Sequence, residues 1–145
     1  MGRIVVGVDG SDGSLEALGW AARQAQLTGD SLEAVTTWDY PATGWASMVP
    51  GMPTEFDPEK LARQIQEESL ERVLGPDAAG AVTRTVLVGN AAQTLLDRAE
   101  GASLLVVGAR GHSGFRAAML GSVGIHVTHH APCPVVVVRG TTGEE

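Results

Sequence analysis

Short, mostly apolar segments rich in Val, Ile and Leu recur along this chain, and longer segments with helical spacing of apolar residues separate them. Short segments of this kind are typical of strands that are buried on both faces of a sheet. The alternation predicts an α/β fold, with one parallel sheet and helices on both of its faces. The expected strands are Ile4–Val8, Leu32–Trp38, Val82–Val88, Ser103–Val107 and Pro134–Val138.

Capping residues give the helices between these strands clear boundaries. Ser11 or Ser14 can cap the first helix, which Gly29 ends. The second helix is expected to begin with the Asp57 cap and Pro58 and to end at the pair 75–76. Asn90, with Gln93 three residues later, resembles a capping box that opens the third helix. The last helix is expected from about Ser122 to His130, before Pro132.

The connection from Asp39 to about Glu55 has no such pattern and contains three prolines and two glycines. Connections of this length without structure of their own are often functional, so a lid or a partner surface is expected there. The 145 residues fit one domain, and we expect it to span residues 1–140 with a polar tail at residues 141–145.

The composition limits which classes of binding partner and which cellular compartment we expect for this chain. Ten Lys and Arg stand against 17 Asp and Glu, a net charge of −7, so a fold-wide basic surface for nucleic acid is absent. The one cysteine, Cys133, excludes a disulfide framework and is expected to be a small structural thiol. No apolar run reaches the length of a membrane span or of a signal-peptide core, so a cytoplasmic protein with no membrane partner is expected.

Two polar segments follow predicted strands, at the place where open parallel sheets bind ligands. The first is Gly7-Val8-Asp9-Gly10-Ser11 and the second runs from Gly108 to Gly114. Glycines let the backbone approach an anion, and a helix beginning at Ser122 would add unpaired amides and the positive end of its dipole. The second segment therefore predicts phosphate binding, with Ser113 and Ser122 hydroxyls and Arg110 as further donors.

The full spacing is Gly108, two residues, Gly111, nine residues, then Gly121-Ser122, which is neither a Walker A loop nor Gly-x-Gly-x-x-Gly. This spacing resembles the universal stress protein family in its ATP-binding branch, marked by Gly-x2-Gly-x9-Gly-Ser/Thr. The strand end Val8-Asp9-Gly10-Ser11 and the turn and strand at 131–135 resemble the same family. The likeness covers residues 3–139. It implies a five-stranded parallel sheet in the order 3-2-1-4-5 and a homodimer formed through the last strand, Val135–Val138.

The resemblance also implies an ATP site. Asp9 matches the acid that reaches the nucleoside part of ATP or its Mg²⁺, which makes it the candidate metal ligand. Thr37 takes the place of an adenine-contacting residue, and Gly121 to Val123 match the start of the phosphate-binding helix. Arg110 and His112 fall at variable loop positions. The implied site residues are Gly7, Asp9, Thr37, Gly108, Ala109, Arg110, Gly111, His112, Ser113, Gly114, Gly121, Ser122 and Val123.

Three functions remain open at this point. The first is an ATP-binding stress-response module with at most slow ATP hydrolysis, since no general base held by a second group is evident. The second is an adenylating or phosphotransfer enzyme on a related scaffold. Such enzymes usually carry Ser-Gly-Gly-x-Asp-Ser or His-x-Gly-His, and residues 10–14 and 111–114 match neither. The third is a structural dimer that binds no nucleotide.

Two further features have alternative interpretations. His126, His129 and His130 have the spacing of a helical metal site, but histidines at a helix C-terminus also complement its dipole. Val135–Val138 would be an apolar edge strand, which pairs readily with another chain. Pairing with the same strand of a second copy would cover it and gives a physical reason to expect a two-fold dimer.

Overall fold

A computed structural model describes residues 2–39, 57–109 and 116–139 of the chain, with side chains from residue 123 onward in the last range. Five strands form one sheet in the order β3-β2-β1-β4-β5, and every neighbouring pair is parallel. The predicted fold class and strand order are confirmed. The strands are β1 (Arg3–Gly7), β2 (Ser31–Trp38), β3 (Thr83–Val88), β4 (Leu104–Gly108) and β5 (Val135–Val138).

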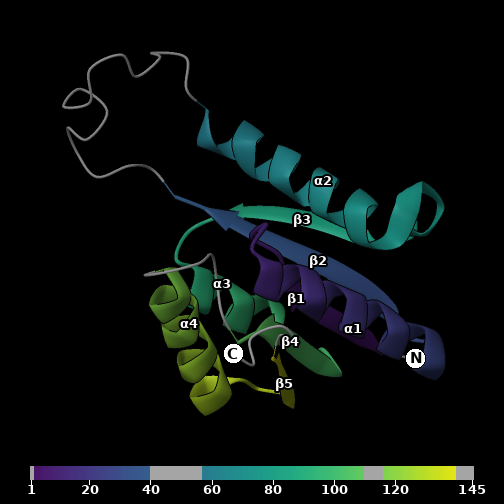
Figure 1. Cartoon of the computed structure of the whole chain (residues 1–145). Helices are drawn as coiled ribbons and strands as arrows, with labels where there is room; N and C mark the ends of the chain where they lie inside the picture. The colour runs from purple at the N-terminus through teal and green to yellow at the C-terminus, as the bar shows by residue number, and fades with distance from the viewer. Residues whose placement is uncertain (1, 40–56, 110–115, 140–145) are drawn as a thin grey trace.

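Helices cover both faces of the sheet, with α1 and α2 on one face and α3 and α4 on the other (Figure 1). Strand residues alternate between the faces, so the core divides into two clusters. Ile4, Val6 and Leu18 belong to the cluster under α1 and α2, and Val5 and Leu105 to the one under α3 and α4. The helices are α1 (Asp12–Thr28), α2 (Pro58–Ala79), α3 (Ala91–Arg98) and α4 (Arg116–His130).

Local capping chemistry sets the ends of α1 and α2 as the sequence predicts. Ser11 is the N-cap of α1, and its hydroxyl accepts a hydrogen bond from the Ser14 amide at 3.2 Å. Gly29 ends α1 in the left-handed conformation. Asp57 caps α2. Gly75, at a φ of 84°, interrupts α2 where its end was predicted, but helical residues continue to Ala79.

The predicted capping box of α3 is half formed. The Asn90 side chain accepts from the Gln93 amide at 3.0 Å, as expected for an N-cap. The Gln93 side chain does not return to Asn90, because it donates to Asp97 Oδ1 at 3.0 Å one turn further along the helix. Of the two bonds of the box, only the one to the Asn90 side chain is formed.

The predicted start of the last helix is wrong. Helix α4 begins at Arg116, six residues before Ser122, so Gly121 and Ser122 lie inside the helix. The intervening Arg-Ala-Ala-Met-Leu stretch, residues 116–120, consists of strong helix formers, which extend the helix toward its N-terminus past the glycine. Two other predictions, the 39–55 connection and the 141–145 tail, fall almost wholly outside the described residues.

None of the helices in the described ranges combines the length and the apolar character needed to cross a membrane.

Candidate functional site

A pocket lies at the carboxyl ends of β1, β2 and β4, on the face of the sheet that α3 and α4 cover. Strands β1 and β4 are hydrogen-bonded neighbours, so the loops that follow them meet at this edge. This is the place where open parallel sheets bind ligands. The lining residues are Gly7, Val8, Asp9, Ser14, Val35, Thr37, Ala91, Leu95, Val107, Gly108 and Val123.

Five of the site residues predicted from the sequence line this pocket together: Gly7, Asp9, Thr37, Gly108 and Val123. They come from β1 and the turn after it, from β2, from β4 and from α4. Of the two neighbouring threonines of β2, Thr37 is the one that lines the pocket. Its neighbour Thr36 is buried on the other face, where its hydroxyl donates to the Val8 carbonyl at 2.8 Å.

Six lining residues were not predicted as site residues: Val8, Ser14, Val35, Ala91, Leu95 and Val107. Val35 and Val107 lie on the pocket side through strand alternation, a signal that the sequence does carry. Ala91 and Leu95 belong to α3, whose position over the sheet depends on contacts far apart in the chain. The Asn90 cap was the only sequence signal that placed Ala91 at the start of that helix.

The turn after β1 holds Asp9 in a fixed position. Asp9 Oδ1 accepts from the Ser11 amide at 2.9 Å, and the Asp9 amide donates to Ser14 Oγ at 3.2 Å. Asp9 is exposed, and its Oδ2 makes no hydrogen bond within the described residues. One carboxylate oxygen thus anchors the turn, and the other has no partner among the described residues and can accept from a hydroxyl or coordinate a cation.

Gly108 has a packing role that the motif did not reveal. A Cβ at this position would stand 2.5 Å from the Gly13 carbonyl oxygen, in the first turn of α1. The adjacent Ala109 amide donates to the Val138 carbonyl at 2.8 Å, so sheet pairing with β5 already uses it. The first two residues of the predicted phosphate loop therefore help to hold α1 and β5 in place.

The remaining predicted residues divide into two groups. Gly121 and Ser122 lie within α4, where amides this far from the N-terminus donate to carbonyls one turn earlier. The others are outside the described residues: Arg110, Gly111, His112, Ser113 and Gly114.

The pocket is narrow and mostly apolar. Its volume is about 50 Å³, enough for a water molecule or two and too small for a whole nucleotide. Leu95 occupies part of the space, since its Cδ1 would lie 3.2 Å from a Cβ placed at Gly7.

A second hollow, of about 260 Å³, lies on the opposite face between the β1 turn, α1 and α2. Asp9 borders both hollows. The other residues around it are Gly10, Leu15, Ile65, Glu68, Ser69 and Arg72.

The histidines of α4 lie close to one another on the helix surface. His126 and His130 pack with their ring centroids 4.6 Å apart, as expected for positions one turn apart. In the described part of the chain, no group of three or more His, Cys, Asp or Glu side chains is arranged to hold a metal ion. Burial raises the pKa of the Cys133 thiol, which favours the unreactive protonated form and agrees with a structural role.

Comparison with known proteins places this chain among a large group of relatives. A universal stress protein of Mycobacterium tuberculosis strain H37Rv is 34% identical over 137 residues, which cover 94% of this chain and 44% of that protein. A universal stress protein of Mycolicibacterium smegmatis is 33% identical over 141 residues, covering 94% of this chain and 48% of that protein. This chain therefore spans less than half the length of these curated relatives.

Solved structures agree in fold. A universal stress protein in complex with cAMP superposes with a TM-score of 0.65 at 29% identity, covering 94% of this chain and 95% of that chain. The universal stress protein UspA of Lactobacillus plantarum gives a TM-score of 0.72 at 24% identity, covering 95% and 97% of the two chains. The universal stress protein family model matches residues 1–139. This chain belongs to the universal stress protein family.

Proposed function

We propose that this chain binds an adenine nucleotide in the pocket at the carboxyl ends of β1, β2 and β4, and that this nucleotide is ATP. The observation that carries the proposal is that Gly7, Asp9, Thr37, Gly108 and Val123 line one pocket at the position expected for a ligand in an open parallel sheet. The similar structure in complex with cAMP, at 29% identity, gives further support to an adenine nucleotide.

Each wall of the pocket has a distinct part in this proposal. The base packs against the apolar wall formed by Val35, Leu95 and Val107, and the Thr37 hydroxyl offers a hydrogen bond to its edge. The second carboxylate oxygen of Asp9 accepts from a ribose hydroxyl or coordinates the Mg²⁺ of Mg-ATP. The residues fit such a group because Asp9 combines a fixed backbone with an available carboxylate oxygen.

The phosphates are proposed to follow the segment from Gly108 to Ser122. Contact with the amides of Gly121 and Ser122 requires the preceding turns of α4 to unwind, because those amides are internal to the helix. A glycine at 121 lowers the cost of such unwinding. ATP binding in this form would be accompanied by a shortening of α4 from its N-terminus.

The proposed activity is that of a regulatory binding module. Of the described residues that line the pocket, only Asp9 has a titratable side chain, so no partner group there turns it into a poised general base. Any ATP hydrolysis is accordingly slow. Residues 1–140 form the binding domain in this proposal, with 141–145 as its tail and the cytoplasm as its compartment.

A homodimer completes the proposal. Strand β5 pairs with β4 on one side, and its Val137 side chain is 40% exposed. Pairing of this strand with its copy in a second chain would cover both the exposed valine and the open edge.

Calorimetric titration of Mg-ATP tests the nucleotide site. We expect micromolar binding to the wild-type chain and at least tenfold weaker binding to Ala91→Trp, because the indole would fill the pocket from the first turn of α3. Gln93→Trp is the matched control, since Gln93 lies in the same turn but is exposed outside this pocket. Equal affinities of the wild type and Ala91→Trp would contradict the proposed site.

A further inference from the structure

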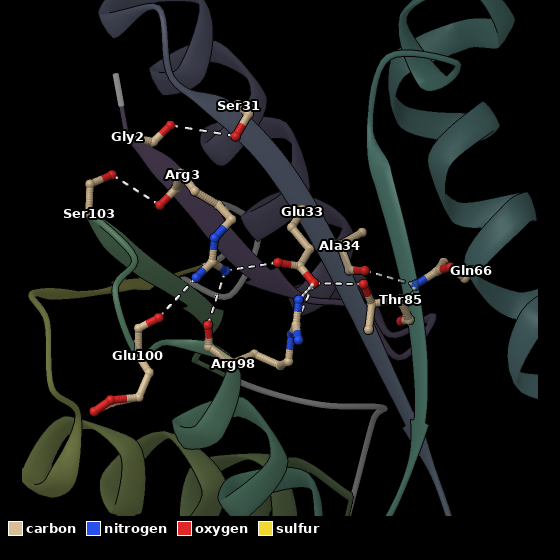
Figure 2. A network of polar contacts seen from close by, with 10 residues as sticks. All are labelled: Gly2, Arg3, Ser31, Glu33, Ala34, Gln66, Thr85, Arg98, Glu100 and Ser103. Atoms are coloured by element: carbon tan, nitrogen blue, oxygen red, sulfur yellow. Dashed lines mark hydrogen bonds and ion pairs between the residues drawn. The ribbon is translucent and has the colours of Figure 1, made fainter.

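A buried carboxylate lies on the same face of the sheet as the pocket, toward the other end of β2. The Glu33 side chain is 1% exposed. Its Oε1 accepts from Arg3 Nη1 at 2.8 Å, and its Oε2 accepts from Arg98 Nη2 at 2.6 Å and from Thr85 Oγ1 at 2.6 Å (Figure 2). Arg98 Nε adds a further bond to Oε2 at 3.1 Å. We call these four residues the Glu33 cluster.

The Glu33 cluster holds the C-terminal end of α3 in two ways. Arg98 is the last residue of α3, and its guanidinium is bound directly to Glu33. Arg3 donates to the Arg98 carbonyl at 3.0 Å and to the Glu100 carbonyl at 3.0 Å, just beyond the helix (Figure 2). A cation there satisfies carbonyls that have no partner within the helix and complements the helix dipole. Both arginines thus join the end of α3 to one carboxylate on β2.

The other end of α3 forms a wall of the pocket. Ala91, its first residue, and Leu95 both line the pocket. The helix has eight residues, which corresponds to a length of about 12 Å. Residues 33, 35 and 37 share one face of β2 because strand residues alternate. The Glu33 cluster and the pocket therefore lie at opposite ends of the same short helix, over the same strand.

We propose that Glu33 is a positioning residue for the pocket: its carboxylate fixes α3 along the sheet and thereby sets where Ala91 and Leu95 stand. Without the carboxylate, Arg3 and Arg98 would no longer be held to β2. Leu95, Leu96 and Ala99 would still bury α3 against the sheet, so we expect the helix to shift rather than to detach. The consequence for nucleotide affinity rests on the function proposed above, whereas the movement of the pocket wall does not.

A purely structural role for Glu33 makes a different prediction. It would lower the free energy of unfolding but leave the pocket of the folded protein unchanged. The chain offers a matched control in Arg84, which pairs with Glu67 at 2.8 Å and also donates to the Ala79 carbonyl at the end of α2. Arg84 of β3 thus binds a carboxylate and the last carbonyl of a helix, both belonging to α2, and none of its bonds goes to α3.

The test is methyl NMR of the nucleotide-free protein, well below the unfolding temperature, combined with calorimetry of Mg-ATP. Glu33→Gln and Arg98→Gln are expected to shift the methyl resonances of Ala91 and Leu95 and to weaken ATP binding five- to tenfold. Arg98→Lys keeps the positive charge, so its methyl resonances and its ATP affinity should lie closer to those of the wild type than the values for Arg98→Gln. Arg84→Gln should change neither the methyl resonances nor the affinity.

Each outcome decides one part of the inference. Unchanged Ala91 and Leu95 resonances in Glu33→Gln and Arg98→Gln would overturn the positioning role. Shifted resonances with unchanged ATP affinity would overturn the link to binding. A wild-type chain that binds no ATP would overturn the proposed function, while the methyl resonances would still decide the positioning role. If Glu33→Gln does not fold, Arg98→Gln still provides the comparison, because it removes the direct bond between α3 and the Glu33 carboxylate.

Discussion

Gly108 is required by a close contact between two backbones, at the point where β4 meets the first turn of α1. A Cβ there would stand 2.5 Å from the Gly13 carbonyl oxygen and 2.6 Å from its carbonyl carbon, distances that side-chain rotation cannot relieve. We predict that Gly108→Ala lowers the free energy of unfolding by about 2–3 kcal/mol, as overpacking of a tight site does. Urea unfolding of the two proteins measures this difference.

Gly124 is the control for that substitution. It is buried in α4, and among the described residues no atom other than those of its chain neighbours and the adjacent α4 backbone lies within 4 Å of a Cβ placed there. Gly124→Ala should therefore stabilise the protein by about 0.5–1 kcal/mol, through the higher helix propensity of alanine. If Gly108→Ala were as stable as the wild type, the backbone of Gly108 would not be in tight contact with Gly13.

The same contact affects how binding data are interpreted. Because a side chain at residue 108 disturbs the packing of β4 against α1, a loss of ATP binding in a Gly108 variant would not prove that a phosphate contact had been lost.

At the scale of single elements, the Glu33 cluster gives α3 and the sheet a pH-dependent connection. Burial by itself raises the pKa of Glu33, but the Thr85 and Arg98 hydrogen bonds and the charges of Arg98 and Arg3 together hold it below the ordinary value of 4.5. The folded state therefore favours the ionised carboxylate. This contribution to stability is complete above the pKa of the unfolded chain and is lost as the pH falls through the lower pKa of the folded protein.

We predict that Glu33→Gln costs about 2–3 kcal/mol of unfolding free energy at pH 7. This is somewhat below the range of about 3–5 kcal/mol for a broken buried ion pair, because both arginines are partly exposed and can be rehydrated. Urea unfolding at several pH values from 7 down to 3 should show the difference between wild type and variant shrinking below about pH 4.5. A difference that stays constant across this range would contradict the ionised cluster.

The sequence predicted well those helix starts that depend on contacts between residues close together in the chain. Ser11, Asp57 and Asn90 cap helices through bonds to amides two or three residues away, which a sequence pattern contains. The start of α4 was wrong because helix formers before Gly121 outweighed a motif that in its family marks a helix start. The α3 wall of the pocket was missed because Arg3 and Glu33, far away in sequence, determine where that helix lies.

At the scale of the whole molecule, the two edges of the sheet allow a direct test of the proposed dimer. Strand β5 forms one edge and β3 the other, and Val137 and Val88 are exposed on them. We predict that light scattering gives about 30 kDa for the wild type, twice the 15.0 kDa of one chain. Val137→Lys should halve this mass, because a buried lysine disfavours pairing of the strands.

Val88→Lys introduces the same charge at the opposite edge and should leave the mass unchanged. A wild-type mass near that of one chain, or loss of the dimer in Val88→Lys alone, would exclude the β5 interface. The position of β5 also explains why the dimer and the pocket are independent proposals, since none of the residues that line the pocket belongs to β5.

Whether an adenine nucleotide occupies the pocket beyond the ends of β1, β2 and β4 can be measured by a methyl NMR titration with Mg-ATP. We expect saturable shifts of the methyl resonances of Val35, Leu95 and Val107, which line the pocket. Resonances of Leu18 and Leu70, in the core on the opposite face, should stay in place. Unchanged pocket resonances at saturating ATP, or shifts confined to the opposite face, would show that ATP does not bind in this pocket.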